Sequence, residues 1–169
     1  MLLALALAIV TTAGVLAFAA FNQPDGGGSG LARGSAVPDI AGTTLDGEAF
    51  RLSDLRGSPV IVNFWGPSCV PCRDEFPLFL SKLDQYADDG LVIVGVLMHD
   101  PPGPARDFMR EFGATWETVE DPDGAIRAAY LTVARPTSYF VDADGRLRSI
   151  QLGEVREADF DRQYAAIAP

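Results

Sequence analysis

The chain has 169 residues and a formal net charge of −10 at pH 7. After removal of an apolar leader and a polar spacer, roughly 130 residues remain, which fits one α/β domain with its own core rather than two domains. The acidic balance and the lack of a basic run exclude nucleic acid as a partner, because nucleic-acid binding needs clustered Lys and Arg to replace phosphate counterions.

The N-terminal segment, Met1 to Phe21, carries no charge and is rich in Leu, Ala, Val and Ile. A helix needs about 20 such residues to cross a bilayer, so we expect an uncleaved transmembrane anchor. The small-x-small pattern at Ala17 to Ala19 leaves a cleaved signal peptide as the alternative, which would make the protein secreted. Residues 22–35 contain the glycine-rich run Gly26 to Gly30 and predict a flexible linker. A folded domain is therefore expected at residues 36–169, held at the cell membrane on its extracytoplasmic side.

The elements of this domain follow from hydrophobic patterning and turn residues. Val37 to Leu52 predicts a β-hairpin with Asp46-Gly47 at its turn, and Ser53 is expected to cap a short helical turn that ends near Gly57. In chain order we then expect a buried strand at Val60 to Trp65, a helix at Cys69 to Ala87 with a kink at Pro77, a buried strand at Leu91 to Met98, a helix at Ala105 to Phe112, a turn at Asp121 to Gly124, a short helix at Ala125 to Tyr130, strands at Thr137 to Asp142 and Arg146 to Leu152, and a helix at Glu157 to Ile167. The first strand–helix–strand unit implies parallel strands with a right-handed crossover.

Cysteine usage indicates redox chemistry. The chain has two cysteines, Cys69 and Cys72, in the motif Cys-Val-Pro-Cys, and one histidine, His99. A tetrahedral zinc site built from these residues is one ligand short unless carboxylates help, so no metal is expected and His99 is assigned to a loop. The loop between the cysteines is too short for a useful structural disulfide. The expected redox group is the Cys69–Cys72 disulfide itself, with no further cofactor.

The cysteine motif stands where a buried strand ends and a helix begins. A helix N-terminus offers unpaired N–H groups and a partial positive charge, which favour the thiolate and lower the pKa of Cys69. Cys72 lies one helical turn further on, on the same face and deeper. We therefore expect Cys69 to attack a substrate disulfide and Cys72 to resolve the mixed disulfide.

Several segments around this motif resemble thioredoxin-like proteins of the TlpA/ResA type, which are tethered extracytoplasmic reductants often linked to cytochrome c maturation. The matching segments are Ala36-Val37-Pro38-Asp39, Leu52-Ser53-Asp54-Leu55-Arg56-Gly57, Val62-Asn63-Phe64-Trp65, Cys69-Val70-Pro71-Cys72-Arg73, Glu75-Phe76-Pro77, Arg135-Pro136-Thr137, Phe140-Val141-Asp142 and Asp144-Gly145. The resemblance implies an α/β thioredoxin fold, a central mixed sheet flanked by helices, with an N-terminal β-hairpin extension and a central insertion.

The resemblance also implies roles for residues near the cysteines. Pro136 is expected to be a cis-proline that faces the motif, and Trp65, Pro71, Arg135 and Pro136 are expected to border a substrate groove. Trp65 is also expected to pack against the active-site turn and to shield it.

Proton transfer is expected to depend on Glu75. Ordinary thioredoxins carry a buried Asp where this chain has Asn63, and an amide cannot take up a proton. The resemblance places Glu75 in the active-site cavity, where burial would raise its pKa.

Two residues depart from the family pattern. Ser68 precedes the first cysteine, where many relatives have Trp or another bulky residue, and Arg135 precedes the expected cis-proline, where a small or β-branched residue is common. We expect Arg135 to bring a cation beside Cys69 and to favour both its thiolate and acidic substrates.

These features predict a thiol–disulfide oxidoreductase that reduces disulfides of exported proteins, including apocytochrome c. Expected partners are thiol- or disulfide-bearing proteins and a membrane electron donor that recharges the dithiol. One alternative is an oxidase that forms disulfides in secreted proteins, because the direction depends on the reduction potential. Another is a non-enzymatic binding module with the same fold.

Overall fold

The computed structural model describes residues 31–169, and Leu31–Pro169 form one compact unit. The predicted anchor at Met1 to Phe21 and most of the predicted linker lie outside these residues. Within residues 31–169 no helix is both long enough and apolar enough to cross a membrane.

The last five residues of the predicted linker belong to the folded unit, which corrects the expected domain boundary at residue 36. The Gly34 amide donates to the Leu147 carbonyl over 2.6 Å, and the Leu147 amide donates to the Ser35 carbonyl over 2.9 Å. Leu147 begins the outermost strand of the sheet, whose free edge needs hydrogen-bond partners. Pairing with that edge, which lies far away in the sequence, orders a segment that its composition assigns to the linker.

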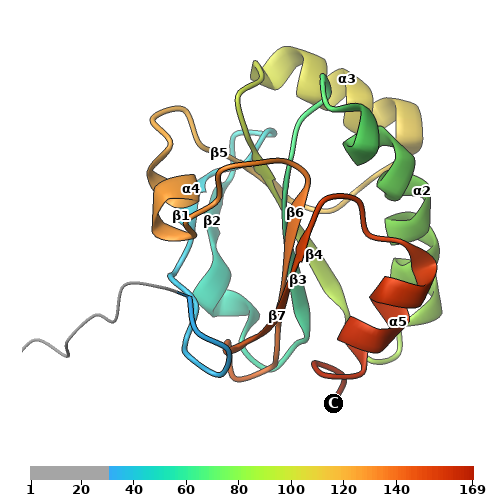
Figure 1. Ribbon diagram of the computed structural model, residues 1–169. Helices are drawn as coiled ribbons and strands as arrows, with labels where there is room; N and C mark the ends of the chain where they lie inside the picture. The colour runs from blue at the N-terminus through green and yellow to red at the C-terminus, as the bar shows by residue number, and fades with distance from the viewer. Residues whose placement is uncertain (1–30) are drawn as a thin grey trace, which may run out of the picture. The chain divides into compact units, whose positions relative to one another are not determined.

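A five-stranded mixed sheet lies at the centre of the domain (Figure 1). Its strands are β3 (Val60–Trp65), β4 (Val92–Leu97), β5 (Thr118–Glu120), β6 (Thr137–Val141) and β7 (Leu147–Leu152), in the spatial order β5-β4-β3-β6-β7. Strand β3 runs parallel to β4 and β4 runs parallel to β5, whereas β6 runs antiparallel to both β3 and β7.

Helices cover both faces of this sheet (Figure 1). The helices are α2 (Val70–Gln85), α3 (Pro102–Phe112), α4 (Ala125–Ala129) and α5 (Glu157–Tyr164), with a 3₁₀ turn, η1, at Leu52–Leu55. Helices α2, α3 and α5 pack on one face, and α4 and η1 on the other, together with the hairpin of β1 (Ala41–Thr43) and β2 (Ala49–Arg51). This is the predicted thioredoxin fold with its hairpin extension. Along the sequence, the elements between β4 and β6 are α3, β5 and α4.

Strand β3 places the active site because both of its faces are buried. Ile61 and Trp65 belong to the hydrophobic cluster on the α2 side, whereas Val62 and Phe64 belong to the cluster on the α4 side. Side chains alternate between the faces of a strand, so Asn63 also points toward α2. A polar amide is thereby fixed inside the core, directly behind the cysteine motif.

Three local predictions need correction. The sequence analysis missed β5, because a three-residue strand has little pattern of its own and forms through its pairing with β4. Helix α3 begins at Pro102 instead of Ala105, since proline is tolerated in the first turn of a helix. Ser53 does not cap η1, which follows Arg51 without a side-chain cap, and its hydroxyl instead donates to Asp39. The kink expected at Pro77 stays a prediction.

Candidate active site

Cys69 and Cys72 form a disulfide at the N-terminus of α2, with their Cα atoms 5.3 Å apart. Cys69 is the N-cap residue, and its sulfur accepts the Cys72 amide N–H over 3.3 Å. Cys69 is 7% exposed and Cys72 is fully buried. A thiolate at Cys69 would be stabilised by the Cys72 backbone N–H and by the partial positive charge at the helix N-terminus. The exposure supports Cys69 as the attacking thiol, and the order of attack stays a prediction.

Glu75 lies one turn past Cys72 and is 1% exposed. One carboxyl oxygen accepts from the Asn63 side-chain amide over 2.9 Å, and the other accepts from the Val155 backbone N–H over 3.0 Å. Burial raises the pKa of Glu75 to about 8 against the lowering effect of these two hydrogen bonds. This carboxyl can therefore gain or lose a proton near neutral pH, as a general acid or base must.

Asn63 holds Glu75 in place and cannot titrate itself. Its amide nitrogen donates to Glu75 and, over 3.0 Å, to the Ser138 hydroxyl on β6, while its own side-chain oxygen has no partner. Because Asn63 is an amide, Glu75 is the titratable member of this buried pair. Ser138 and Val155 were not identified from the sequence, since both reach the site only through tertiary pairing.

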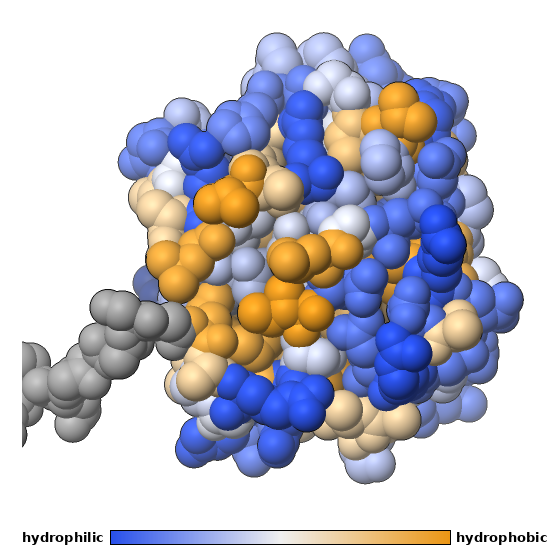
Figure 2. All heavy atoms as spheres, viewed as in Figure 1, coloured by the Kyte–Doolittle hydropathy of each residue, from blue (hydrophilic) through white to orange (hydrophobic). Residues whose placement is uncertain are grey.

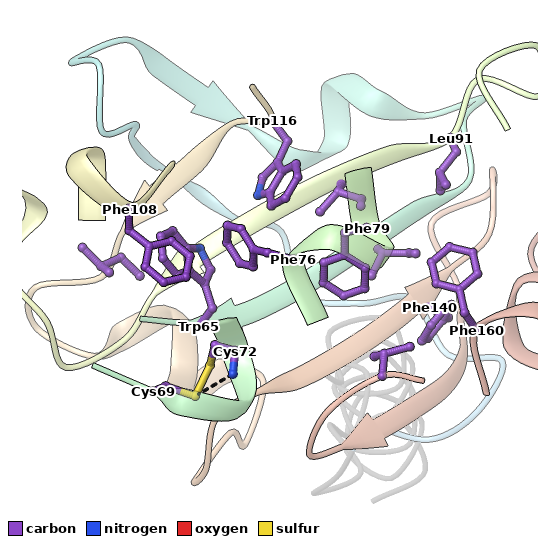
Figure 3. Packing of buried hydrophobic residues seen from close by; sticks show 14 of the residues in the cluster. Trp65, Cys69, Cys72, Phe76, Phe79, Leu91, Phe108, Trp116, Phe140 and Phe160 are labelled. Atoms are coloured by element: carbon purple, nitrogen blue, oxygen red, sulfur yellow. Dashed lines mark hydrogen bonds between the residues drawn. A yellow bond between two sulfur atoms is a disulfide. The ribbon is translucent and has the colours of Figure 1, made fainter. Parts of the chain in front are cut away.

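Trp65 has the packing role predicted for it, and the structure corrects only its predicted place at the border of a substrate groove. It is fully buried, and its ring packs against Phe76 and Phe108 with centroid distances of 4.8 and 5.1 Å. Figure 3 shows its ring just behind the disulfide, within the aromatic core. Its position at the end of β3, on the face that α2 covers, places the indole inside the protein. Trp65 supports the cysteine turn from behind.

The other three groove residues, Pro71, Arg135 and Pro136, line one open cavity of about 490 Å³. The Arg135–Pro136 peptide bond is cis, as predicted. The remaining lining residues are Gln151, Gly153, Glu154, Arg156 and Asp159. The cavity thus lies between the cysteine helix, the cis-proline loop and the segment that leads from β7 to α5. The role of these residues in substrate binding stays a prediction.

The guanidinium of Arg135 is not the free cation beside Cys69 that the sequence predicts. It forms an ion pair with Asp100 over 2.6 Å, and it also donates to the Met98 carbonyl and the Ser68 hydroxyl. Asp100 was missed in the sequence. A usable signal was present, because β3 and β4 are parallel neighbours and their carboxyl ends, where Ser68 and Asp100 follow, must lie at the same edge of the sheet.

This arrangement can exchange electrons with a thiol or disulfide. With the pair reduced, the Cys69 thiolate attacks a substrate disulfide, a bond forms between Cys69 and one substrate sulfur, and the other substrate sulfur leaves and takes up a proton. Cys72 then loses its proton and attacks Cys69, which releases the second substrate thiol and re-forms the Cys69–Cys72 disulfide. Two electrons pass to the substrate, and the role of Glu75 as the acceptor of the Cys72 proton stays a prediction.

Comparison with known proteins agrees with this chemistry. The AhpC/TSA family matches residues 33–150. The chain is 34% identical over 139 residues to the thiol-disulfide oxidoreductase ResA of Geobacillus kaustophilus, covering 82% of this chain and 80% of that protein. The ResA of Bacillus subtilis is 28% identical over 143 residues, with 85% and 80% covered. A crystal structure of a putative thiol:disulfide interchange protein DsbE from Chlorobium tepidum superposes with a TM-score of 0.74 at 31% identity, covering 81% of this chain and 98% of that one.

Proposed function

Because the chain belongs to the AhpC/TSA family and is a thiol–disulfide oxidoreductase, we propose that it reduces disulfides of exported proteins, apocytochrome c among them. The observation that carries the proposal is the charge around the cysteine pair. A buried carboxyl, Glu75, lies one turn past Cys72, and the guanidinium of Arg135 is balanced by Asp100.

These charges favour a reductant because a strong oxidant needs a stabilised reduced form, usually a thiolate of low pKa. A carboxyl and a balanced ion pair add little to the thiolate stabilisation that the helix N-terminus already supplies. The reduced pair therefore gains little stability over the Cys69–Cys72 disulfide, and it gives up its electrons readily.

The surface around the cavity suits a substrate segment that is not fully folded. Val70, Val133 and Leu152 expose 71%, 92% and 74% of their surface, and each is close in sequence to a residue that lines the cavity. Figure 2 shows apolar groups on the face that carries β7 and the loop before β6. Exposed apolar side chains of this kind mark interaction sites. An exported protein before cofactor attachment offers the matching apolar side chains.

The proposal also includes the place of action. The uncharged segment Met1 to Phe21 would anchor the protein in the cell membrane, with the domain on the extracytoplasmic side and recharged by a membrane electron donor. Protease added to cells with an opened envelope should release the domain by cutting within residues 22–30. A mature protein that begins near Ala20 would reject the anchor but not export.

A redox titration of the Cys69–Cys72 couple tests the direction. The full chain in mild detergent is equilibrated with dithiothreitol and glutathione buffers, and the dithiol fraction is read by alkylation and mass. We expect a potential near the −270 mV of thioredoxin, and a value near the −120 mV of a strong oxidant would reject the reductant.

Loss of the protein in its host tests the substrate. Cells without it should lack covalent haem on their c-type cytochromes, and a small dithiol added outside the cell should restore haem attachment. Normal cytochromes in such cells would reject apocytochrome c as substrate while leaving the reductase activity in place.

A further inference from the structure

Three segments meet at the carboxylate of Asp100, next to the cysteine turn. One oxygen of Asp100 accepts from Arg135 over 2.6 Å, from the Ser68 hydroxyl over 3.0 Å and from the Ser68 backbone N–H over 3.3 Å. Arg135 closes the group by donating to the Ser68 hydroxyl over 2.6 Å. The residue before Cys69 is thereby tied to the residue before Pro136 and to the loop after β4.

The backbone of the cysteine turn is shaped to receive this ion pair. A Cβ atom at Gly66 would lie 2.3 Å from the Arg135 guanidinium and 2.3 Å from the Asp100 carboxylate. Only glycine allows both charged groups to lie against the turn. The Arg135 and Asp100 side chains are 19% and 12% exposed, so solvent screens them less than it screens an ordinary surface pair.

Opposite charges that both contact Ser68 act in opposite directions on the sulfur of the next residue. The guanidinium favours a Cys69 thiolate and the carboxylate disfavours it. While the pair is intact the two effects largely cancel, and removal of either partner leaves the other charge uncompensated in a shielded position.

From this geometry we infer that Asp100 is a positioning residue for thiol–disulfide exchange, which fixes Arg135 and the turn that carries Cys69 and offsets the guanidinium charge at the nucleophile. The Asp100–Arg135 ion pair thus sets how strongly the Cys69 thiolate is stabilised. The inference concerns the oxidoreductase reaction itself and does not depend on whether the protein reduces or oxidises its substrate.

Other charged groups around the cysteines stay the same in every variant of this pair, so they do not affect a comparison among variants. They are Glu75 on α2, the exposed Arg73–Glu111 ion pair between α2 and α3, and Glu154, Arg156 and Asp159 in the cavity lining.

The test measures the rate of Cys69 alkylation against pH in the reduced full chain, together with the equilibrium constant for reduction of the disulfide by dithiothreitol. Asp100→Asn should lower the pKa of the Cys69 thiol by up to about one unit, which raises alkylation at low pH by about three- to tenfold. The equilibrium constant should rise. Arg135→Gln should change all three quantities in the opposite direction.

Two further variants separate charge from packing. The double variant Asp100→Asn/Arg135→Gln should return the thiol pKa close to wild type, because both charges are gone. The control Asp107→Asn, which removes a carboxylate from the exposed Asp107–Arg110 ion pair on α3, should leave it nearly unchanged. Arg135→Met, which also removes the charge and keeps an apolar stem, serves if Arg135→Gln does not fold. A purely structural network predicts that both single variants shift the pKa in the same direction and that the double variant is worst. That outcome, or no shift in either single variant at low salt, would overturn the inference.

Discussion

Helix α2 buries two ionisable side chains seven residues apart and treats them in opposite ways. Glu75 is 1% exposed and Lys82 is 2% exposed. The Lys82 ammonium lies 2.6 Å from Asp161 and 3.8 Å from Glu157, both on α5. Glu75 has no such counter-ion in its hydrogen bonds, which come from neutral donors.

The difference separates a structural charge from a chemical one. A buried charge is costly unless an opposite charge and hydrogen bonds compensate it. Lys82 is compensated, so it stays charged and ties α2 to α5. Glu75 is not, so burial raises its pKa to about 8 and its protonation can change in the pH range where thiols react. The charge without a counter-ion is therefore at the end of α2 that carries the cysteines, where we expect proton transfer.

The largest effect should follow loss of either sulfur, since both sulfurs take part in the exchange. Cys69→Ser should abolish disulfide exchange, whereas Cys72→Ser should still attack and accumulate mixed disulfides with substrate. Non-reducing gels of cell extracts, followed by mass spectrometry of the trapped species, distinguish the two. Mixed disulfides that form through Cys72 in the Cys69→Ser protein would reverse the order of attack, and the proton role of Glu75 with it.

The second-largest effect should be a slower disulfide exchange after substitution of Glu75, compared with substitution of Lys82 on the same helix. Glu75→Gln keeps the size of the side chain and removes its titration, so it should slow disulfide exchange by roughly 10²-fold or more, within the usual range of general acid–base catalysis. Lys82→Met is the matched control on the same helix and should leave the rate per folded molecule within about twofold of wild type, because Lys82 is outside the reaction. Stopped-flow exchange from pH 5 to 9 provides the comparison. A Glu75→Gln profile that superimposes on that of the wild type would show that the proton leaves through water.

The difference in unfolding free energy between Glu75→Gln and the wild type should change with pH, because Glu75 titrates in the wild type and Gln does not. A carboxyl whose pKa is raised on folding, here from 4.5 to about 8, favours the folded state below its unfolded pKa and loses that contribution as pH rises through 8. The unfolding free energy of the variant should therefore rise relative to that of the wild type between pH 4.5 and 8, by at most about 5 kcal/mol.

Urea unfolding at pH 4.5, 6 and 8 measures this gain. At pH 4.5 the variant should be about 1 kcal/mol less stable than the wild type. The amide nitrogen that Glu75→Gln introduces would face an N–H donor whose hydrogen bond the Glu75 carboxyl oxygen accepts in the wild type. A difference in unfolding free energy that stays constant across the three pH values would mean that Glu75 titrates normally in the folded protein.

The sequence predicts the parts of the site that depend on neighbours along the chain. The junction of β3 and α2 and the place of Cys69 at its start follow from an apolar run, a Gly-Pro turn and helical spacing. The burial of Glu75 was predicted from the family resemblance. The cis bond at Pro136 came from resemblance alone. Val155 and Ser138 could not be predicted in this way, because they reach the site only when separate segments pack together. For Asp100 the parallel pairing of β3 and β4 was a usable signal.

Trp65 shows how a local motif can mislead. The buried strand predicted at Val60 to Trp65 already implies a buried, packed side chain, whereas its place at the groove was inferred from the neighbouring cysteine motif. Aromatic residues of α2 and α3 pack around its ring and bury it fully.

The smallest of the expected effects concerns the compensated end of α2. Asp161→Asn removes the nearer counter-ion of Lys82 while Glu157 and the Gln85 side chain, 3.0 Å from the ammonium, remain. The loss should be about 1–3 kcal/mol of unfolding free energy, less than the 3–5 kcal/mol of a fully buried pair, because the Asp161 side chain is 50% exposed.

Exchange kinetics of Asp161→Asn should stay at the wild-type level wherever the protein is folded, since α5 holds the helix but does not touch the sulfurs. Denaturant melts at low and high salt check the energy, and the loss should shrink with salt because part of the pair faces water. The double variant Lys82→Met/Asp161→Asn should recover stability relative to Asp161→Asn alone, because it leaves no buried ammonium to compensate. If the double variant were instead the less stable of the two, the stem of Lys82 would contribute more through packing than its charge costs, and the contrast with Glu75 would be one of shape rather than charge.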